Sequence, residues 1–444
     1  MASRLHRLRR MSERSLSVLI LHRMGNPAVA PHFLRKHVMS FQESFPESVC
    51  LFHDVKLPLP SFVRGISFDA VFLDVTMLGS RWRGEEEFAR VKSEYAFIRE
   101  LPSARIAFPQ DEYDCSEILD DWMCEWSVDC VMSVLPAHEA VLYPKFRKKG
   151  QIQLGFTGYV DEAMIGRAVQ PHKNHRIDIG YRAKKLPPYF GRMGEVKWTI
   201  ARDVLAKCKG SGLMTDIAWG DGRTLSGEQW IDFLGNCRWT IGSSSGSSLL
   251  DPRGEIQRRV KEYVANHPNA GFDEVERMCF PGEDGRHRMS AISPRAIEAA
   301  LLGTGQMLVD GEYSGILQPD QHYLALRADA SNFAEVRDAM RDLTAVDAMI
   351  RRCREVILDD HRLRYSARDR LLDGLIRSVG VGRTVPADTQ DTRSIVDAYQ
   401  SHMAPAYRAL WNREAREAQL RKVLARLPVP IARAIRNVAA RIGR

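Results

Sequence analysis

The amino-acid sequence predicts an α/β protein with two doubly wound domains in tandem and a helical C-terminal extension. Short apolar runs alternate with segments of helical period, which is typical of parallel sheets covered by helices. The alternation stops in a polar, proline-containing stretch at 169–175 and then starts again. From about residue 345 the pattern is helical and rich in arginine. These observations divide the chain into 1–15, 16–175, 176–345 and 346–444.

Six strands are expected in the first domain and five in the second, each a short apolar run. The long run at 68–78 is expected to form a single buried strand. The expected strands are 16–21, 49–52, 68–78, 105–108, 128–134 and 152–156, then 177–181, 213–217, 239–241, 306–309 and 323–326. Helices are expected at 31–41, 85–100, 116–126, 195–207, from 227, at 294–302 and at 332–343.

Length and composition narrow the class of protein. The 444 residues suffice for two or three domains, and 44% apolar with 27% charged residues is typical of soluble globular proteins. No apolar run approaches the ~20 residues that span a bilayer, and the N-terminus lacks a proper signal peptide. None of the eight cysteines forms a C-x-x-C pair, so we expect buried free thiols and a cytoplasmic protein.

The positive charge lies at the two ends of the chain. The net charge is +8 overall, +4 within residues 1–15 and +8 within 401–444, which leaves −4 for the 385 residues between them. A basic groove across the whole protein is therefore not expected, and nucleic acid is not an expected partner.

The segment SPRAIEAALLGT, residues 293–304, predicts a helix whose start can bind phosphate. Ser293 suits the N-cap and Pro294 the first helical position. Such a start presents unpaired N–H groups, and Glu298 follows about one turn later. The alternative is an ordinary capped helix of an α/β unit.

Three further segments, each at or after a predicted strand, contain residues that could form a binding site. Asp178–Lys197 holds five cations that suit a diphosphate or form a solvated basic loop: Arg182, Lys184, Lys185, Arg192 and Lys197. Asp310–Leu317 (DGEYSGIL) follows the strand at 306–309, at the carboxyl end of which α/β sheets bind ligands. The segment at 242–256 (GSSSGSSLLDPRGEI) suits either a linker or a site loop.

The sequence resembles GT-B-type glycosyltransferases across about 160 residues. The motifs that carry the resemblance, in order along the chain, are DIGYRAKKLPPYFGRMGEVK, then SGSSLLDPRGEI, then the stretch at 292–332 with ISPRAIEAALLGTGQ and DGEYSGIL. FPQDEY (108–113) and TGYVDE (157–162) match more loosely. The resemblance implies two Rossmann-like domains with a cleft between them and a C-terminal half like that of families 1 and 4.

By this resemblance Glu298 would bind the ribose of a nucleotide sugar, and the N–H groups near Ser293 and Arg295 would meet phosphate. Arg182, with Arg192 or Lys197, would neutralise the diphosphate. Glu312, Tyr313 and Ser314 complete the expected donor site. No metal or other cofactor is expected, because the sequence contains no D-x-D. A metal-binding role for His172, His175 or His287 is not favoured either, since no paired ligand spacing surrounds them.

An acceptor hydroxyl must lose its proton as the sugar arrives, which requires a carboxylate or histidine of the N-terminal half. Asp111 and Glu112 follow the strand at 105–108, and His138 follows the strand at 128–134. These three are the candidate bases, although a structural role is the favoured interpretation of each; His22 is a weaker candidate.

The C-terminal tail has helical spacing of Ile431, Ile435, Val438 and Ile442 with arginines on its other faces. Such a helix can lie on an anionic membrane surface or pack across the N-terminal domain.

The sequence thus predicts a glycosyltransferase that moves a sugar from a nucleotide-diphosphate sugar to a hydroxyl of a glycan, lipid-linked or protein acceptor, in glycan or cell-surface polysaccharide synthesis. The alternatives are a nucleotide-sugar 2-epimerase of the same architecture and a non-catalytic sugar-nucleotide-binding protein.

Overall fold

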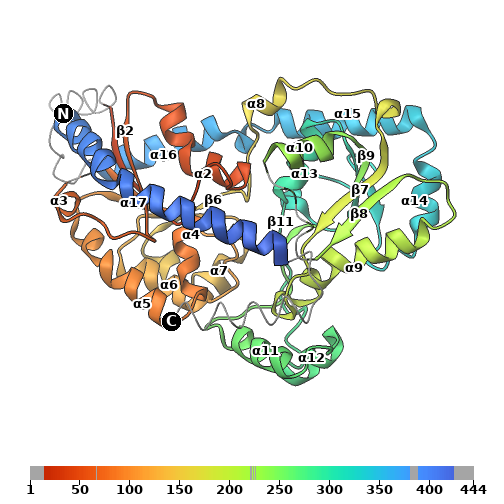
Figure 1. Cartoon of the computed structure of the whole chain (residues 1–444), viewed down its shortest axis with the longest axis horizontal. Coiled ribbons are helices and arrows are strands. Elements are labelled where there is room, and N and C mark those ends of the chain that lie inside the picture. The colour runs from red at the N-terminus through yellow and green to blue at the C-terminus, as the bar shows by residue number, and fades with distance from the viewer. Residues whose placement is uncertain are drawn as a thin grey trace.

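The structure is a computed structural model that describes residues 15–66, 68–220, 223, 225, 227–380 and 389–424. Its two α/β domains lie side by side, each built on one parallel sheet (Figure 1). This confirms the predicted α/β class with two Rossmann-like domains. The predicted apolar stripe at 431–442 and residues 1–14 lie outside the described residues, so the membrane-surface prediction stays a prediction.

The N-terminal sheet has six parallel strands in the order β2-β1-β3-β4-β5-β6. Their apolar side chains are buried on both faces, between α5 and α6 on one side and α2 and α16 on the other. The strands are β1 (Ser17–His22), β2 (Val49–Asp54), β3 (Ala70–Leu73), β4 (Ala104–Ala107), β5 (Cys130–Ser133) and β6 (Gln151–Leu154). The helices are α2 (His32–Ser44), α3 (Ser61–Arg64), α4 (Val75–Leu78), α5 (Glu85–Glu94), α6 (Ser116–Glu125), α7 (Glu139–Leu142) and α8 (Glu162–Ile165).

The prediction of a single strand at 68–78 is wrong. Strand β3 ends at Leu73, and Asp74 then caps α4 by accepting a hydrogen bond from the amide of Thr76 (2.9 Å). An aspartate N-cap turns the chain into a helix although the following residues are apolar enough to continue a strand.

The C-terminal sheet has five parallel strands in the order β13-β12-β9-β7-β8. Strand order reverses between β7 and β9, and in such sheets this reversal point is where ligands bind. The strands are β7 (Ile177–Ala183), β8 (Thr215–Trp219), β9 (Cys237–Gly242), β12 (Gly305–Val309) and β13 (Leu324–Leu326). The helices are α9 (Gly191–Lys207), α10 (Glu228–Gly235), α13 (Pro294–Leu301), α14 (Phe333–Ala339) and α15 (Leu343–Asp359).

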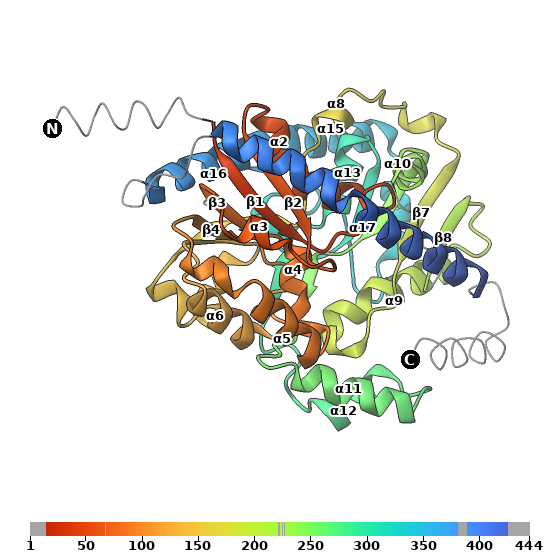
Figure 2. The same ribbon diagram turned by 60° about the vertical axis from the view of Figure 1, so that its left-hand side comes forward.

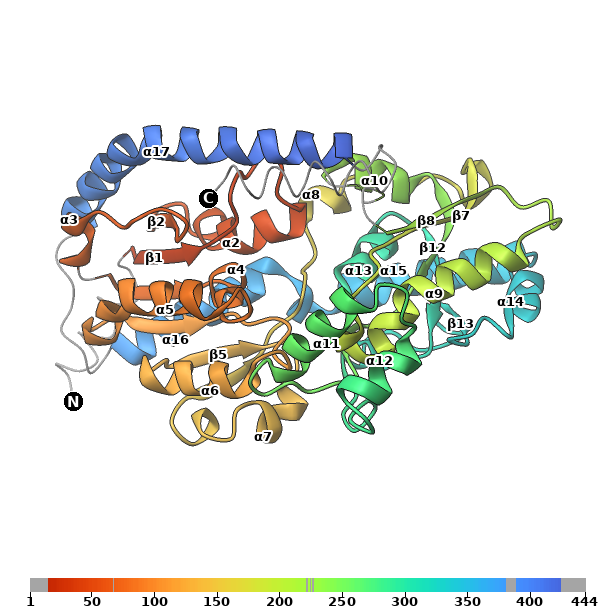
Figure 3. The same cartoon turned by 60° about the horizontal axis from the view of Figure 1, so that its bottom comes forward.

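An insertion between β9 and α13 is absent from the sequence-based prediction. Helices α11 (Glu255–Asn266) and α12 (Phe272–Cys279) form a hairpin with a small core of its own. The hairpin extends away from the domain at the bottom of Figure 1 and lies in front of the body in Figure 3. The short antiparallel pair β10 (Ser245–Ser247) and β11 (Met289–Ala291) closes its base.

The last two described helices return to the N-terminal domain (Figure 2). Helix α16 (Tyr365–Gly380) packs against α2, and α17 (Thr389–Leu424) packs along β2. In the interface of α16 with α2, the buried guanidinium of Arg368 bonds Asp369 and the ring of His37. The predicted helical extension is therefore divided between the domains: α15 packs against α13, whereas α16 and α17 cover opposite faces of the N-terminal sheet.

We expect the docking of α16 to stabilise the fold measurably. Leu372 is fully buried in the N-terminal core, whereas its neighbour Leu371 is 40% exposed. Leu372→Ala should lower the free energy of unfolding by about 2–5 kcal/mol, because it leaves a cavity, and Leu371→Ala should change it by less than about 0.5 kcal/mol. Urea unfolding checks both variants, and equal losses would contradict this placement of α16.

Candidate functional site

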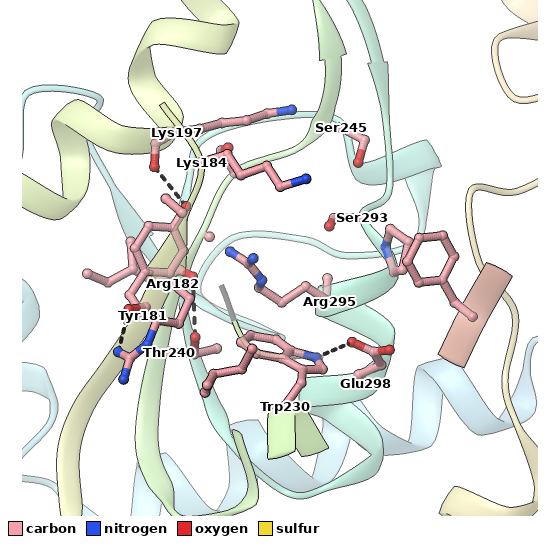
Figure 4. Close-up of a pocket in the computed structure, with 18 of the residues that line it drawn as sticks. Tyr181, Arg182, Lys184, Lys197, Trp230, Thr240, Ser245, Ser293, Arg295 and Glu298 are labelled. Carbon is pink, nitrogen blue, oxygen red and sulfur yellow. Dashed lines mark hydrogen bonds between the residues drawn. The ribbon is translucent and has the colours of Figure 1, made fainter. Parts of the chain in front are cut away.

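A cavity of about 440 Å³ opens at the strand-order reversal of the C-terminal sheet (Figure 4). The carboxyl ends of β7 and β9, the start of α13 and Trp230 of α10 line it. Pro31, His32 and Phe33, at the start of α2, line it from the N-terminal domain. The cavity is therefore shared by the two domains, as expected for the cleft of the predicted fold.

The start of α13 is held in place by both domains. The hydroxyl of Thr157 donates to the carbonyl of Ile292 (2.6 Å), and the amide of Ile292 donates to the hydroxyl of Ser314 (2.9 Å). A Cβ atom on Gly158 would lie 2.9 Å from Cβ of Pro294, so a larger residue there would push the helix away. Ser293 makes no side-chain capping bond and lines the cavity.

Arg295 extends from this helix start into the cavity (Figure 4). Its guanidinium lies over the rings of Tyr181 and Trp230, at 5.0 and 4.9 Å from the ring centres. Among the described residues it has no carboxylate within ion-pair distance. It interacts electrostatically with Glu298, although the two side chains form no ion pair. A cation held between aromatic rings in this way is available to an anionic ligand.

Two lysines face the same space as Arg295 (Figure 4). Tyr181 donates to the carbonyl of Lys197 (2.9 Å), which fixes the helix turn that carries the lysine. Burial lowers the pKa of the Lys197 ammonium, and Asp111 across the cleft partly offsets this. Lys184, in the loop after β7, is exposed and also lines the cavity. The three cations can neutralise a diphosphate placed at the start of α13.

Glu298 lies on the far side of Arg295, one turn into α13, and is only 9% exposed. The indole N–H of Trp230 donates to its carboxylate (2.8 Å). Burial raises the pKa of Glu298, and the Trp230 bond opposes this rise. A buried carboxylate with one fixed donor keeps further acceptor capacity for hydroxyl groups of a ligand.

Two of the predicted donor-binding cations are engaged elsewhere. Arg182 lines the cavity, but its guanidinium bonds the carboxylate of Asp216 on β8 (2.8 Å) and lies over the ring of Phe233. Arg192 pairs with Asp273 of α12 (2.6 Å) and does not line the cavity. Strand β7 directs Arg182, and helix α9 directs Arg192, toward a neighbouring acidic residue. The positions of these two arginines therefore do not support the predicted contact with a diphosphate.

The residues of the predicted loop after β12 do not line the cavity. Glu312 is exposed, and Tyr313 is fully buried with its hydroxyl 2.5 Å from the carbonyl of Val309. Ser314 bonds Ile292 as described above, with a φ angle of +55°. This loop therefore supports the approach to α13, and its placement does not support direct contact with a donor.

Asp111 belongs to the N-terminal domain and does not line the cavity, but it interacts electrostatically with Lys197, which does. The hydroxyl of Tyr113 donates to its carboxylate (2.6 Å), and its backbone has a φ angle of +47°, which is strained for a residue with a side chain. The buried guanidinium of Arg81 holds this loop by donating to the carbonyls of Gln110, Asp111 and Asp114. Nothing in the sequence singles out Arg81 for this task.

The other two predicted bases are placed differently. Glu112 is fully buried and accepts hydrogen bonds from Ser133, Val134 and Tyr143. His138 lies in a short 3₁₀ turn after β5 and does not line the cavity. Neither position supports a role as base in the cleft. The weaker candidate His22 is also buried, beside Asp54.

Sequence reasoning missed His32, which lines the cavity as the first residue of α2. Its Nε2 atom bonds the carboxylate of Asp161, and Lys36 lies 3.5 Å from the same carboxylate. A carboxylate only accepts, so Nε2 carries a proton and the ring is fixed in orientation. Thr157, Gly158 and Asp161 all belong to the TGYVDE motif, which could have drawn attention to this part of the cleft.

Known structures were compared with the chain. An alpha-glucosyltransferase in complex with UDP and a 13-mer DNA is 8% identical, with a TM-score of 0.47 over 82% of this chain and 100% of that chain. Sucrose-phosphate synthase from Thermosynechococcus elongatus is 12% identical, with a TM-score of 0.45 over 82% and 99%. HepE of Anabaena in complex with UDP is 9% identical, with a TM-score of 0.44 over 82% and 100%.

These similar structures are glycosyltransferases or bind UDP. At such identities and TM-scores, the similarity concerns the overall arrangement of helices and strands and not individual residues. No family model and no curated protein matches the sequence.

The described residues were also searched for metal sites and membrane spans. They contain no group of three or more His, Cys, Asp or Glu side chains that could hold a metal ion, and the expected metal independence stays a prediction. Among the described helices, none combines the length and apolar character that crossing a bilayer requires.

The stability of the protein should depend on the titration of Glu112. Burial raises the pKa of Glu112 from its ordinary 4.5 to about 7, so between these values the native state binds more protons than the unfolded state. The free energy of unfolding should therefore fall as pH rises through this window, by roughly 3 kcal/mol from this group. Glu112→Gln imitates the neutral carboxyl and should lack this loss.

Urea unfolding of the wild-type protein and of Glu112→Gln at about pH 5 and about pH 8 measures the difference. Every other titrating group is shared by the two proteins. Identical pH dependences would contradict the raised pKa of Glu112.

Proposed function

We propose that the protein is a glycosyltransferase that binds a nucleotide-diphosphate sugar in the cavity between its domains. One observation carries the proposal: the start of α13 and the unpaired Arg295 face the same space as Lys184 and Lys197, with the buried Glu298 one turn away. The cations would suit a diphosphate, and the buried carboxylate of Glu298 can accept hydrogen bonds from the hydroxyl groups of a ribose joined to it. The binding of UDP by similar structures agrees with this chemistry.

In the proposed reaction the bond between the sugar and the diphosphate breaks as an acceptor hydroxyl attacks the sugar. The negative charge that develops on the diphosphate is stabilised by Arg295, Lys197 and the N–H groups at the start of α13. These groups are fixed before the reaction and need no metal ion, so we propose that transfer proceeds without one.

Asp111 is the residue we propose as the acceptor base. Asp111 does not itself line the cavity, but its carboxylate interacts electrostatically with Lys197, which does line it. This proximity supports a position for Asp111 near the bound diphosphate and sugar. His32 also lines the cavity, but it lies beside Glu298, with which it interacts electrostatically. That position suits contact with the nucleoside from the N-terminal domain.

The natural acceptor is proposed to be a hydroxyl of a glycan, a lipid-linked sugar or a protein in glycan or cell-surface polysaccharide synthesis. A panel of nucleotide sugars, screened by thermal shift and then assayed for release of nucleoside diphosphate with EDTA present, tests the function. Binding at 100 times Kd adds about 2.7 kcal/mol of stability. Release of free sugar without acceptor would favour the epimerase, and binding without turnover would favour a non-catalytic protein.

Arg295→Ala should weaken the binding of the nucleoside diphosphate about tenfold or more, because it removes a charge-assisted contact with phosphate. Binding of the nucleoside alone should change little. Arg192→Ala is the matched control, since that arginine pairs with Asp273 outside the cavity. Isothermal titration with both ligands measures the difference, and an equal loss for nucleoside and diphosphate would place Arg295 away from the phosphates.

Asp111→Asn should lower kcat by about a hundredfold or more and leave the Kd of the nucleoside diphosphate unchanged, because it removes only the proton acceptor. Glu112→Gln, one residue later but buried in the core, should keep turnover. Steady-state kinetics and titration separate the two effects. Full activity of Asp111→Asn would eliminate Asp111 as the base.

A further inference from the structure

The loop between β1 and α2, residues 23–31, leads directly into the cavity. It ends at Pro31, which lines the cavity together with His32 and Phe33 of the first turn of α2. Within the loop, Asn26 forms a turn: its side chain accepts from the amide of Ala28 (2.9 Å) and its carbonyl accepts from the amides of residues 29 and 30. The conformation of this loop therefore sets the N-terminal wall of the cavity.

Helix α17 reaches this loop from the other end of the chain. Glu414 accepts a hydrogen bond from the amide of Asn26 (2.9 Å) with one carboxylate oxygen. Its other oxygen accepts from the ammonium of Lys56, which follows β2. The side chains of Glu414 and Lys56 are only 22% and 21% exposed, so water weakens these charged contacts less than on an open surface.

Gly25 shows how closely the loop backbone approaches this carboxylate. Its φ angle is +78°, and a Cβ atom there would lie 2.5 Å from a carboxylate oxygen of Glu414. The amide of Gly25 donates to the buried carboxylate of Asp54 (2.8 Å). The loop is thus held between Asp54 of the sheet and Glu414 of α17, with no room for a side chain at Gly25.

The register of α17 is fixed independently of Glu414. The hydroxyl of Tyr399 bonds the ring of His53 (2.7 Å), and the hydroxyl of Tyr407 accepts from the amide of Asp54 (2.9 Å). Glu414 follows Tyr407 by two helical turns and lies on the same face. The helix therefore delivers Glu414 to the loop at a defined position, beyond the part of α17 that packs on β2.

We propose that Glu414 is a positioning residue that latches the β1–α2 loop, and through it the first turn of α2, at the cleft. The consequence for sugar transfer rests on the proposed function; the ordering of the loop does not. Without Glu414, residues 24–31 open locally while the sheet stays intact, and the N-terminal wall of the cavity loses its fixed position.

Hydrogen exchange of the full chain, followed by mass spectrometry, tests the latch. In Glu414→Ala, exchange in 24–31 should become about tenfold faster, as expected for loss of a charge-assisted hydrogen bond, while β1 and β2 keep their protection. Glu414→Gln keeps an oxygen for the amide of Asn26 but loses the charge toward Lys56, so its effect should be intermediate. Glu417→Ala, on the exposed side of the same helix, should leave 24–31 unchanged.

Unchanged exchange in Glu414→Ala would overturn the proposal. Faster exchange throughout β1 and β2 would also overturn it, because Glu414 would then support the whole domain. In binding assays the latch predicts a higher Kd for the nucleoside diphosphate in Glu414→Ala, because the released wall carries His32, which lines the cavity. If the wild-type protein transfers no sugar, the proposed function fails, and the exchange experiment still decides the latch.

Discussion

The contact between the TGYVDE segment and the start of α13 is the constraint on which the cavity depends. Thr157 bonds the carbonyl of Ile292, and Gly158 packs against Pro294 without room for a side chain. This contact joins the two domains at the helix start that carries Ser293 and Arg295. The TGYVDE segment follows β6, at the carboxyl edge of the N-terminal sheet. The contact therefore places this edge opposite the start of α13, which binds phosphate in our proposal.

The presence or absence of an ion pair distinguishes the cations available to a ligand from those that stabilise the fold. Arg182 and Arg192 come from the same basic segment, 178–197, as Lys184 and Lys197, yet each is neutralised by a carboxylate of a neighbouring element. Arg295 is instead held by aromatic rings, which orient a guanidinium without cancelling its charge. A ligand anion therefore has more to gain from Arg295 than from an arginine that must first leave its partner.

The sequence predicts the alternation of strands and helices well, because parallel strands buried on both faces leave continuous apolar runs. It fails where one residue redirects the chain, as Asp74 does, and where an insertion such as α11–α12 begins at the end of a segment, 242–256, that suits a linker. In the site, Ser293, Arg295 and Glu298 follow from a predicted helix start and its spacing, and Lys197 follows from the basic segment at 178–197. The structure brings all four to one cavity, and their roles toward a ligand stay predictions. The pairing of Arg182 with Asp216 and of His32 with Asp161 is not, because the partners are 34 and 129 residues apart.

The same kind of long-range contact explains why the C-terminal helices belong to the N-terminal domain. Tyr365 donates to the carbonyl of Phe33 (3.1 Å) across 332 residues, and Ser44 donates to the buried Asp369 (2.7 Å). Both contacts act on α2, whose first turn is one wall of the cavity. Helix α2 is therefore held by residues that follow the second domain in the sequence. The N-terminal wall of the cavity thus depends on α2, near the start of the sequence, and on α16, near its end. Neither sheet alone determines the shape of the cavity.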